Sequence, residues 1–571
     1  MHTGRGLPLA VSFVSGAAFA AGPVTPTVID VALSQPTFHG EPNTLMVQAI
    51  VTVDDIENDA FHDATVGYVR SSDYDGCDAT TPWTYSADVQ RFDDDDQRTW
   101  TLYNFVPNAP YRYVVRTGTP ATYQYSCGRL PRVSLPENLA ALHFQYERAG
   151  ASHPVETRYV ALNLDDCGET TASGAHANLF VLDTQNESIV WYLDVAAMTG
   201  ISDATVTGWR YQPASGSEPD RVLAIVDRRY LYVWAFDGTL RGFGDFAAGG
   251  ECDGTTDARG PCGHHDAFQD DRGTTYLLTG RVSPIPTRGT DWAACSSRFV
   301  NDGYEVLDGD LEPTDDYYLM TDADYDPTVD AGPNAHPVPD AASDSCWANT
   351  WAAYLGGDVI DWTHVNSIDR TTDGTQEVLD LSVRNFDQIL RLDADDGSYV
   401  WTLANDPTYS DFRPLRLASG IDGVRGFGGQ HDVHTVAPDT LMLLDNLGDP
   451  AGSRVLRISL DASSSSATID RSWALVDADG APLECPVEGS AQAVPGSRDE
   501  HVLATCRDEY SVVDLDDSSG YPTGHTIAPP LVISLPDGTS DDFCESGGPT
   551  ARGGLRGFYR AYPLETVGSF D

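Results

Sequence analysis

The sequence predicts an all-β protein: a six-bladed β-propeller preceded by a small N-terminal β-sandwich. Short runs rich in β-branched and aromatic residues recur along the chain, and no long helical periodicity competes with them. The 52 glycines and 35 prolines are typical of many turns. A unit of strand, Asp-containing turn and strand recurs about six times after residue 143, and such repeats indicate propeller blades.

The length, composition and net charge of the chain limit the classes of protein to which it can belong. The chain has 571 residues, which predicts two or more domains, and 41% hydrophobic residues, which predicts a folded protein. The formal net charge is -52, and arginine supplies every positive side chain because the sequence contains no lysine. Such acidity opposes binding to nucleic acid or anionic lipid. An anionic substrate therefore needs a site with local positive charge from arginine and histidine.

Residues 1–20 have the pattern of a signal peptide. Arg5 precedes the apolar run Leu7–Ala20, and Ala18-Phe19-Ala20 gives an A-x-A cleavage site. The apolar run is short for a bilayer span, and no later segment is long and apolar enough. We expect an exported protein, periplasmic or secreted, without a membrane span.

The ten cysteines agree with export, because disulfides form in oxidising compartments. No CxxC spacing of a structural zinc site is present. Cys252 and Cys262 bracket a loop rich in glycine and aspartate, and we expect them to bridge and brace it.

Residues 21–136 are predicted to form the β-sandwich. The run YNFVPNAPYRYVVRTG resembles the late strands of a fibronectin type III domain. The acidic run Asp93–Asp96 lacks the spacing of a calcium loop, so we interpret it as a solvated turn.

Residues 143–571 are predicted to form the propeller. The segment Arg281–Gly357 is longer than a blade needs and is expected to include a loop over one face. The tail GGLRGFYRAYPL is expected to close the ring by pairing with the first blade. The blades are expected to begin near Leu162, Gly208, His265, His364, His431 and Gln492.

The candidate site lies where the inner strands of the blades begin, because these strand starts converge at one mouth of the channel. His265, His364 and His431 occupy that place in three blades, Asn366 shares a strand face with His364, and Arg384 ends the next strand. These groups suit a tetrahedral oxyanion, and a neutral imidazole is a capable nucleophile or base. Several histidines also suit a transition metal, which is the alternative interpretation.

Five stretches together resemble the bacterial arylsulfate sulfotransferases, or arylsulfotransferases, from about His143 to the C-terminus: DWTHVNSID…LSVRNFDQILRLD…GSYVWTL, GQHDVHTV…LMLLDN, HHDAFQDDRGTTYLL, GSAQAVPGSRDEHVLAT and FYRAYPL. The resemblance implies a six-bladed propeller after an N-terminal β-sandwich. It implies transfer of a sulfuryl group from a phenolic sulfate ester to a phenol, by a ping-pong route through a sulfohistidine. Neither a nucleotide donor nor another cofactor is implied, and the sequence leaves a homodimer open.

The resemblance also implies roles for the five residues. His431 in Gly-Gln-His matches the nucleophile, His364 and Asn366 match the His-x-Asn motif, and Arg384 matches the sulfate-binding arginine. His265, rather than its neighbour His264, is expected to be the remaining histidine because it precedes Asp266 as His431 precedes Asp432. No metal is implied.

Several neighbouring residues receive lesser roles. Tyr354 or Trp362 is expected to stack on the aryl ring. His434 should face away from His431 and is interpreted as structural. Asp266 and Asp432 either orient neighbouring groups or cap turns. Asp445-Asn446 is most simply a turn, and which histidine exchanges the phenol proton is left open.

Two other functions are kept. A propeller of this kind can be a non-catalytic exported protein that binds a ligand or partner. The run DADDGSYVW also resembles the Asp-x-x-x-Gly-x-x-x-Trp pattern of quinoprotein-like dehydrogenases, but a quinone cofactor leaves the channel-facing histidines unexplained.

Overall fold

A computed structural model describes the chain over a series of separate residue ranges. They are residues 28–35, 37–38, 41–42, 45–53, 62–86, 89–92, 97–118, 120, 122–140, 143–146, 158–166, 177–201, 204–214, 219–246, 262–284, 298–319, 359–361, 363–404, 413–417, 426–447, 452–461, 463, 465–475, 481–485, 489–494, 502–506, 511–516, 523–526, 531–534, 555–556 and 560–564. In these ranges the fold is all β apart from three short helices, α1 (Glu137–Ala140), α2 (Val195–Thr199) and the 3-10 helix η2 (Arg384–Phe386). No helix in them is long and apolar enough to cross a membrane.

The chain divides into two compact units. The first comprises Met1–Leu33, Ala49–Trp100 and Tyr111–Leu130, and the second comprises Ser34–Gln48, Thr101–Pro110 and Pro131–Asp571. The predicted boundaries at residues 136 and 143 remain predictions.

The N-terminal strands form two larger sheets. One has the order β1-β4-β8 and the other β10-β9-β5-β6, with β7 also pairing with β5. A disulfide joins Cys77 to Cys127, the latter within β10. The sandwich packing of these sheets remains a prediction. The strands are β1 (Val28–Ser34), β2 (Thr37–Phe38), β3 (Glu41–Pro42), β4 (Val47–Val53), β5 (His62–Arg70), β6 (Thr84–Tyr85), β7 (Gln90–Phe92), β8 (Gln97–Leu102), β9 (Tyr111–Thr117) and β10 (Gln124–Arg129).

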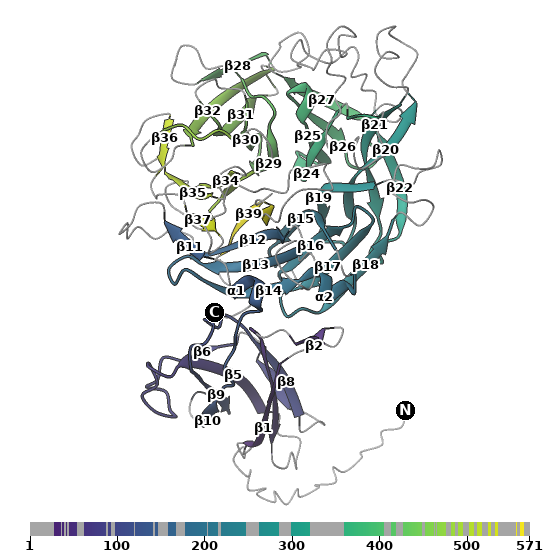
Figure 1. Cartoon of the computed structure of the whole chain (residues 1–571). Coiled ribbons are helices and arrows are strands. Elements are labelled where there is room, and N and C mark those ends of the chain that lie inside the picture. Colours follow the sequence, from purple (N-terminus) through teal and green to yellow (C-terminus); the bar gives the residue numbers. More distant parts are fainter. Residues whose placement is uncertain are drawn as a thin grey trace, which may run out of the picture. The chain divides into compact units, whose positions relative to one another are not determined.

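The second unit is a six-bladed propeller, whose blades follow one another around a ring in chain order (Figure 1). Each blade is given from its innermost strand outward. The first blade consists of β39 (Ala561–Leu564), β12 (Tyr159–Asp166), β13 (Ala177–Asp183) and β14 (Ser188–Asp194), and the second of β15 (Val206–Gln212), β16 (Arg221–Val226), β17 (Tyr230–Ala235) and β18 (Leu240–Asp245). The third blade consists of β19 (Cys262–Gln269), β20 (Thr275–Pro284), β21 (Arg298–Leu307) and β22 (Pro313–Tyr318).

The remaining blades repeat this order. The fourth blade consists of β24 (Val365–Asp373), β25 (Gln376–Val383), β26 (Gln388–Asp393) and β27 (Tyr399–Ala404). The fifth consists of β29 (His431–Ala437), β30 (Thr440–Asp445), β31 (Arg454–Asp461) and β32 (Ser466–Ala474). The sixth consists of β33 (Ser490–Ala493), β34 (Val502–Cys506), β35 (Ser511–Asp516) and β37 (Leu531–Ser534). Five further strands join the sheets at their margins: β11 (His143–Tyr146), β23 (Val359–Asp361), β28 (Arg413–Leu417), β36 (Thr523–Thr526) and β38 (Leu555–Arg556).

The C-terminal strand closes the ring, as predicted. β39 pairs antiparallel with β12, with Ala561 opposite Leu162 and Leu564 opposite Tyr159. The innermost strand of the first blade therefore comes from the far end of the chain. This pairing covers an edge that β12 would otherwise expose.

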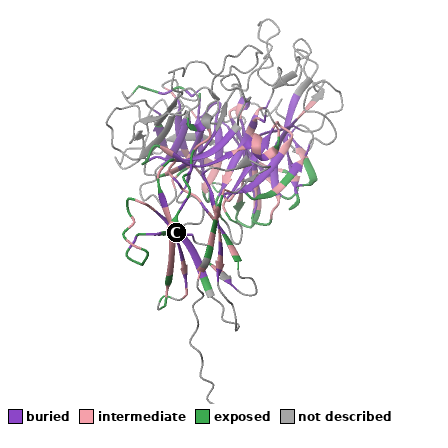
Figure 2. Ribbon diagram, turned by 60° about the horizontal axis from the view of Figure 1, so that its bottom comes forward, coloured by how far each residue is buried: buried purple, intermediate pink, exposed green. Residues whose placement is uncertain are grey.

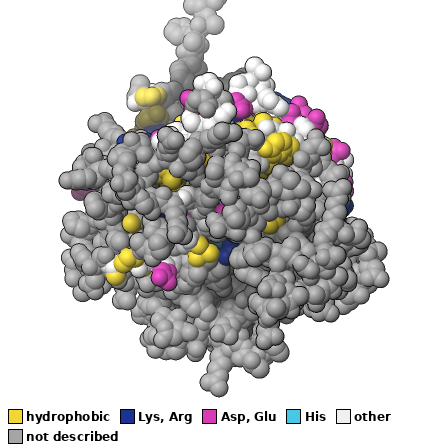
Figure 3. All heavy atoms as spheres, turned by 90° about the horizontal axis from the view of Figure 1, so that it is seen from above, with side chains coloured by type: hydrophobic (Ala, Val, Ile, Leu, Met, Phe, Trp, Pro, Cys, Tyr) yellow, Lys and Arg dark blue, Asp and Glu magenta, His cyan; other side chains and the backbone are white. Residues whose placement is uncertain are grey.

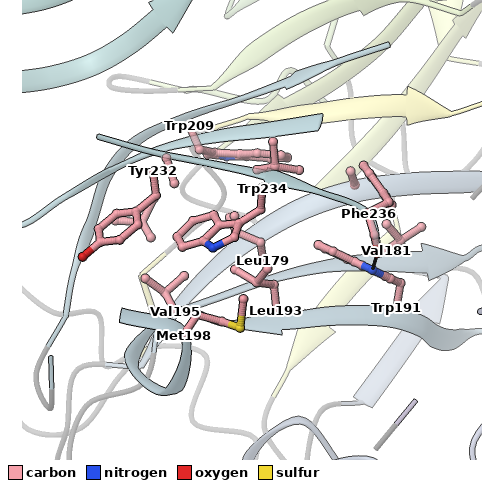
Figure 4. Packing of buried hydrophobic residues seen from close by; sticks show 14 of the residues in the cluster. Leu179, Val181, Trp191, Leu193, Val195, Met198, Trp209, Tyr232, Trp234 and Phe236 are labelled. Atoms are coloured by element: carbon pink, nitrogen blue, oxygen red, sulfur yellow. Dashed lines mark hydrogen bonds between the residues drawn. The ribbon is translucent and has the colours of Figure 1, made fainter. Parts of the chain in front are cut away.

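Separate hydrophobic clusters fill the spaces between consecutive blades, from the first blade to the sixth. Between the first two blades, Trp191, Trp209 and Trp234 pack together, and the Trp191 indole N–H donates to the Phe236 carbonyl at 2.7 Å (Figure 4). Burying a large apolar side chain contributes about 1.5–3 kcal/mol. Figure 2 shows the buried residues concentrated in the strands.

Arg560, the residue just before β39, holds the inner strands together electrostatically. Its fully buried guanidinium contacts Asp266 at 2.5 Å and Asp432 at 3.2 Å. Asp266 also binds Arg210 at 2.9 Å and accepts the backbone N–H of Ile368 at 3.0 Å. This ion cluster therefore joins inner strands of the first five blades.

The cluster shows which of two roles, left open by the sequence, Asp266 and Asp432 have. Asp432 accepts the backbone N–H of Ala491 at 3.1 Å and the Gln492 side chain at 2.6 Å, which adds the sixth blade. Asp266 and Asp432 thus orient groups of other blades rather than capping local turns.

Replacing Arg560 with leucine is expected to destabilise the protein by about 3–5 kcal/mol, because Asp432 and Asp266 keep buried charges that have lost a partner. The measurement is the free energy of unfolding in urea. The matched control is Arg272→Leu, since Arg272 pairs with Glu377 but is 69% exposed, and we expect it to cost about 0–1 kcal/mol. An equal loss of unfolding free energy in the two variants would contradict the proposal that the ion cluster holds the inner strands together.

Candidate functional site

The three predicted histidines lie at irregular points of three inner strands. The register shifts between Gly263 and Ala267 around His265, between Val365 and Ser367 after His364, and between His431 and His434. Such bulges leave residues unpaired and re-aim their side chains. A bulge therefore interrupts the inner strand at the predicted histidine in the third, fourth and fifth blades.

The backbone at these points is in the left-handed region. φ is +57° at His265, +52° at His364 and +54° at Asp432, next to His431. Non-glycine residues rarely adopt this conformation, and such strained residues cluster at functional sites. At His265 a glycine makes room, because a Cβ on Gly208 of β15 would lie 2.5 Å from the His265 carbonyl carbon.

The structure brings the three histidines together. The rings of His265 and His364 meet edge to face with centroids 4.9 Å apart. His431 interacts electrostatically with both of them, and Arg384 interacts with His431. Arg384 begins η2 directly after β25, where its backbone N–H donates to the His364 carbonyl at 3.1 Å.

His431 has a defined tautomer. Its Nδ1 lies 3.0 Å from the Gly429 carbonyl oxygen and 2.9 Å from Oδ1 of Asn446. Asn446 faces His431 with its oxygen because its Nδ2 donates to the Cys485 carbonyl at 2.7 Å. Two acceptors at Nδ1 require a proton there, so Nε2 carries the lone pair in the neutral ring.

Sequence reasoning missed this role of Asn446, which it interpreted as part of a turn. The signal was the pair Asp445-Asn446 after an apolar run. Asp445 is also buried and binds Arg454 at 2.7 Å, so both residues are held by side-chain contacts.

Asn366 is fully buried, and its Nδ2 donates to the carbonyl of Gln430 at 2.8 Å. It therefore supports the backbone just before His431, and its predicted contact with an oxyanion remains a prediction. Gly429 is held similarly, since its N–H donates to Asp387 at 2.7 Å. Burial raises the pKa of Asp387 to about 6, although the Gly429 bond and nearby Arg384 act to lower it.

Two further residues near the site were not singled out as site residues from the sequence. Arg228, in the turn between β16 and β17, adds a positive charge that acts on His265. His264, assigned only a flanking place, has its Nδ1 2.7 Å from Nδ1 of His265. Among the described residues, no group of three or more His, Cys, Asp or Glu side chains is placed to hold a metal ion.

Other predictions have mixed outcomes. His434 points its Nδ1 to the Asp432 carbonyl at 2.9 Å, in keeping with a structural role. Cys262 is disulfide-bonded, but its predicted partner Cys252 lies outside the described residues, as do Tyr354 and Trp362.

Burial keeps two of the histidines neutral. Burial, then the nearby His364, lowers the pKa of His265 well below its ordinary value. Burial, then the charge of Arg384, likewise lowers the pKa of His431, although the Asn446 bond opposes this. The positive charge near His431 therefore resides on Arg384. Elsewhere, Figure 3 shows described acidic side chains at several separate places on one face.

Comparison with known families identifies the segment that contains this site. Residues 261–455 match the model of the arylsulfotransferase (ASST) family. This segment is therefore similar to the arylsulfotransferases. The matched segment includes all three histidines, Asn366 and Arg384. No curated protein has significant sequence similarity to the chain.

Several solved structures are distantly similar to the chain. A putative 6-phosphogluconolactonase from Bacteroides uniformis is 12% identical, covering 74% of this chain and 94% of its own, with a TM-score of 0.30. The dihydro-heme d1 dehydrogenase NirN is 8% identical over 69% and 79%, with a TM-score of 0.29. The Dos1 propeller is 9% identical over 68% and 73%, with a TM-score of 0.27.

The lowered pKa of His265 and of His431 predicts that the folded protein loses stability in acid. Below about pH 6.5 an unfolded histidine binds a proton that buried His265 and His431 do not, so stability falls as pH falls, by about 1.4 kcal/mol per pH unit for each histidine. The measurement is urea unfolding of the wild type and of a His265→Asn, His431→Asn double variant.

The free energy of unfolding of the wild type, relative to that of this variant, is expected to fall by about 2–3 kcal/mol as the pH is lowered from 6.5 to 5.5. Between pH 7.5 and 8.5, where neither state gains a proton on these rings, it should stay constant. A constant difference below pH 6.5 would show that both rings are protonated in the folded protein.

Proposed function

We propose that this protein moves a sulfuryl group from a phenolic sulfate ester to a phenol in two steps, through a sulfated His431. The match of residues 261–455 to the arylsulfotransferase family supports arylsulfotransferase activity in general. The observation that carries the proposal is the tautomer of His431, because two acceptors hold the proton at Nδ1 and make Nε2 the nucleophilic nitrogen.

In the first step, Nε2 of His431 attacks the sulfur of the donor. The N–S bond forms, the bond from sulfur to the phenolic oxygen breaks, and the leaving phenoxide takes a proton from a histidine of the site. The ring then gains positive character, which strengthens the Nδ1–H bonds to Gly429 and Asn446.

In the second step, an acceptor phenol gives its proton back to that histidine, and its oxygen attacks the sulfur. The N–S bond breaks and neutral His431 is restored. The net reaction exchanges one phenol for another on the sulfuryl group, and it needs neither a nucleotide nor another cofactor.

The moving sulfuryl group spreads negative charge over its oxygens, as in phosphoryl transfer. Arg384, partly exposed next to His431, is proposed to bind this charge with His265, His364 and Asn366. Because His431 and His265 are neutral, the nucleophile keeps its lone pair at neutral pH.

The first test uses purified protein with 4-nitrophenyl sulfate, with and without added phenol, and without nucleotide. We expect nitrophenol release that depends on the phenol, is lost in His431→Ala, and leaves sulfate on a peptide containing His431. His434→Ala is the matched control and should retain activity. Absence of activity with a panel of aryl sulfates, from protein shown to be folded, would instead favour a non-catalytic exported propeller that binds a ligand or partner.

A second test concerns Asn446. Its replacement by alanine removes one of two acceptors at Nδ1 of His431, so we expect kcat to fall about 10–100-fold with little change in KM, as when other orienting partners of functional histidines are lost. Asn186→Ala, which removes an asparagine bonded to Asp183 in a first-blade turn, is the control. An Asn446→Ala enzyme with wild-type kcat would contradict the orienting role.

A further inference from the structure

A pair of adjacent histidines lies against the site. His264, which is buried, has its Nδ1 2.7 Å from Nδ1 of His265, and the two rings are nearly perpendicular at 89°. Two ring nitrogens this close must share one proton, because two lone pairs or two N–H groups would repel each other. A proton therefore lies between the two rings.

The other nitrogen of His264 faces a carboxylate. Its Nε2 lies 3.4 Å from Oδ1 of Asp302, within ion-pair distance, and both side chains are at most 2% exposed. Oδ2 of Asp302 accepts the Thr363 hydroxyl at 2.5 Å and the Val365 N–H at 3.1 Å. Asp302 is thus held by the segment that carries His364.

A glycine keeps space for this pair. A Cβ on Gly280 of β20 would lie 3.1 Å from Oδ1 of Asp302, 3.5 Å from Nε2 of His264 and 2.7 Å from the Val300 side chain. Asp302 is the direct strand partner of Gly280. The inner three strands of the third blade are therefore shaped around the contact between His264 and Asp302.

We infer that Asp302 and His264 form a proton relay that makes His265 the general acid and base of the transfer. This inference rests on the proposed function. His264 and Asp302 are positioning residues in it, because they act through His265. The relay answers which histidine exchanges the phenol proton, a point that the sequence leaves open.

The relay moves one proton in each direction. At the start, His264 carries protons on both nitrogens beside Asp302, and His265 accepts at Nδ1 and carries its own proton on Nε2. His265 gives the Nε2 proton to the leaving phenoxide while the Nδ1 proton of His264 passes to Nδ1 of His265. The acceptor phenol later reverses both movements.

In this scheme His265 never becomes positive. That agrees with its surroundings, since burial and the neighbouring His364, His264, His431 and Arg228 all lower its pKa. Before the transfer the positive charge is on His264, beside the Asp302 carboxylate. His264 becomes neutral as its Nδ1 proton passes to His265, and it regains the charge when the acceptor phenol reverses the movements. A lone His265 would have to hold the charge itself, in a place where cations and other histidines surround it.

The test is a single turnover without acceptor, so that only the first step is counted. In His264→Phe, release from phenyl sulfate should slow by about 100-fold or more, because a phenol with a pKa of about 10 needs protonation as it leaves. Release from 4-nitrophenyl sulfate, whose phenoxide leaves unaided, should slow less than about 10-fold. Asp302→Asn should show the same dependence on the leaving group.

His264→Gln separates packing from proton transfer. Its amide can donate to Nδ1 of His265 but cannot release the proton, so it should restore thermal stability and KM without restoring release from phenyl sulfate. His434→Phe is the control and should not distinguish the two donors. Equal slowing of both donors in His264→Phe and Asp302→Asn would overturn the relay while leaving the transfer reaction standing.

A measurement without substrate separates failure of the relay from failure of the proposed function. In histidine-labelled protein, a ¹⁵N-coupled proton spectrum should show a downfield Nδ1 proton that is lost in His264→Phe and shifted in Asp302→Asn. If the wild type transfers no sulfuryl group, the proposed function fails. If the resonance is missing from the wild type, the relay fails whatever the activity.

Discussion

The contact of one arginine with two aspartates supports both the ring and the site. Arg560 lies just before the strand that closes the propeller, and its guanidinium binds Asp266 and Asp432. These aspartates directly follow His265 and His431. Because a buried ion pair needs good geometry to offset its desolvation, a shift of either strand carries a large energetic cost. The interaction that completes the ring therefore also sets the positions of the proposed nucleophile and of the proposed acid and base.

The site combines strained backbone with firmly bonded side chains. His265 and His364 have positive φ, as does Asp432, and bulges interrupt the strands that carry them. Hydrophobic clusters between the blades stabilise the surrounding sheets and so support this local strain. Hydrogen bonds to Asn446 and Gly429 then select one tautomer of His431. Rigid strands thereby hold the side chains in place before substrate binds.

Charge is distributed unevenly in this protein. The chain as a whole carries a formal charge of -52, whereas Arg384 and Arg228 act on the histidines of the site. Near the axis, buried aspartates are paired with arginines, so their charges are compensated locally. The anionic sulfate ester of the proposed reaction would thus meet local positive charge inside a protein whose overall field repels it. Screening by salt weakens that long-range repulsion more than it weakens contacts within the buried site.

Strand periodicity, repeat spacing and turn composition were enough to predict the all-β class, the six blades and the closing role of the C-terminal strand, because each depends on local patterns that recur along the chain. The same repeat placed His265, His364 and His431 at equivalent positions and so predicted that they meet. Tertiary structure alone decided the rest. Arg560 reaches Asp266 across 294 residues, Asp302 reaches Thr363 across 61, and Asn446 faces His431 only because the Cys485 carbonyl binds its amide. The protonation state of a histidine depends on which acceptors and charges surround it in space, and no local pattern in the sequence encodes that arrangement.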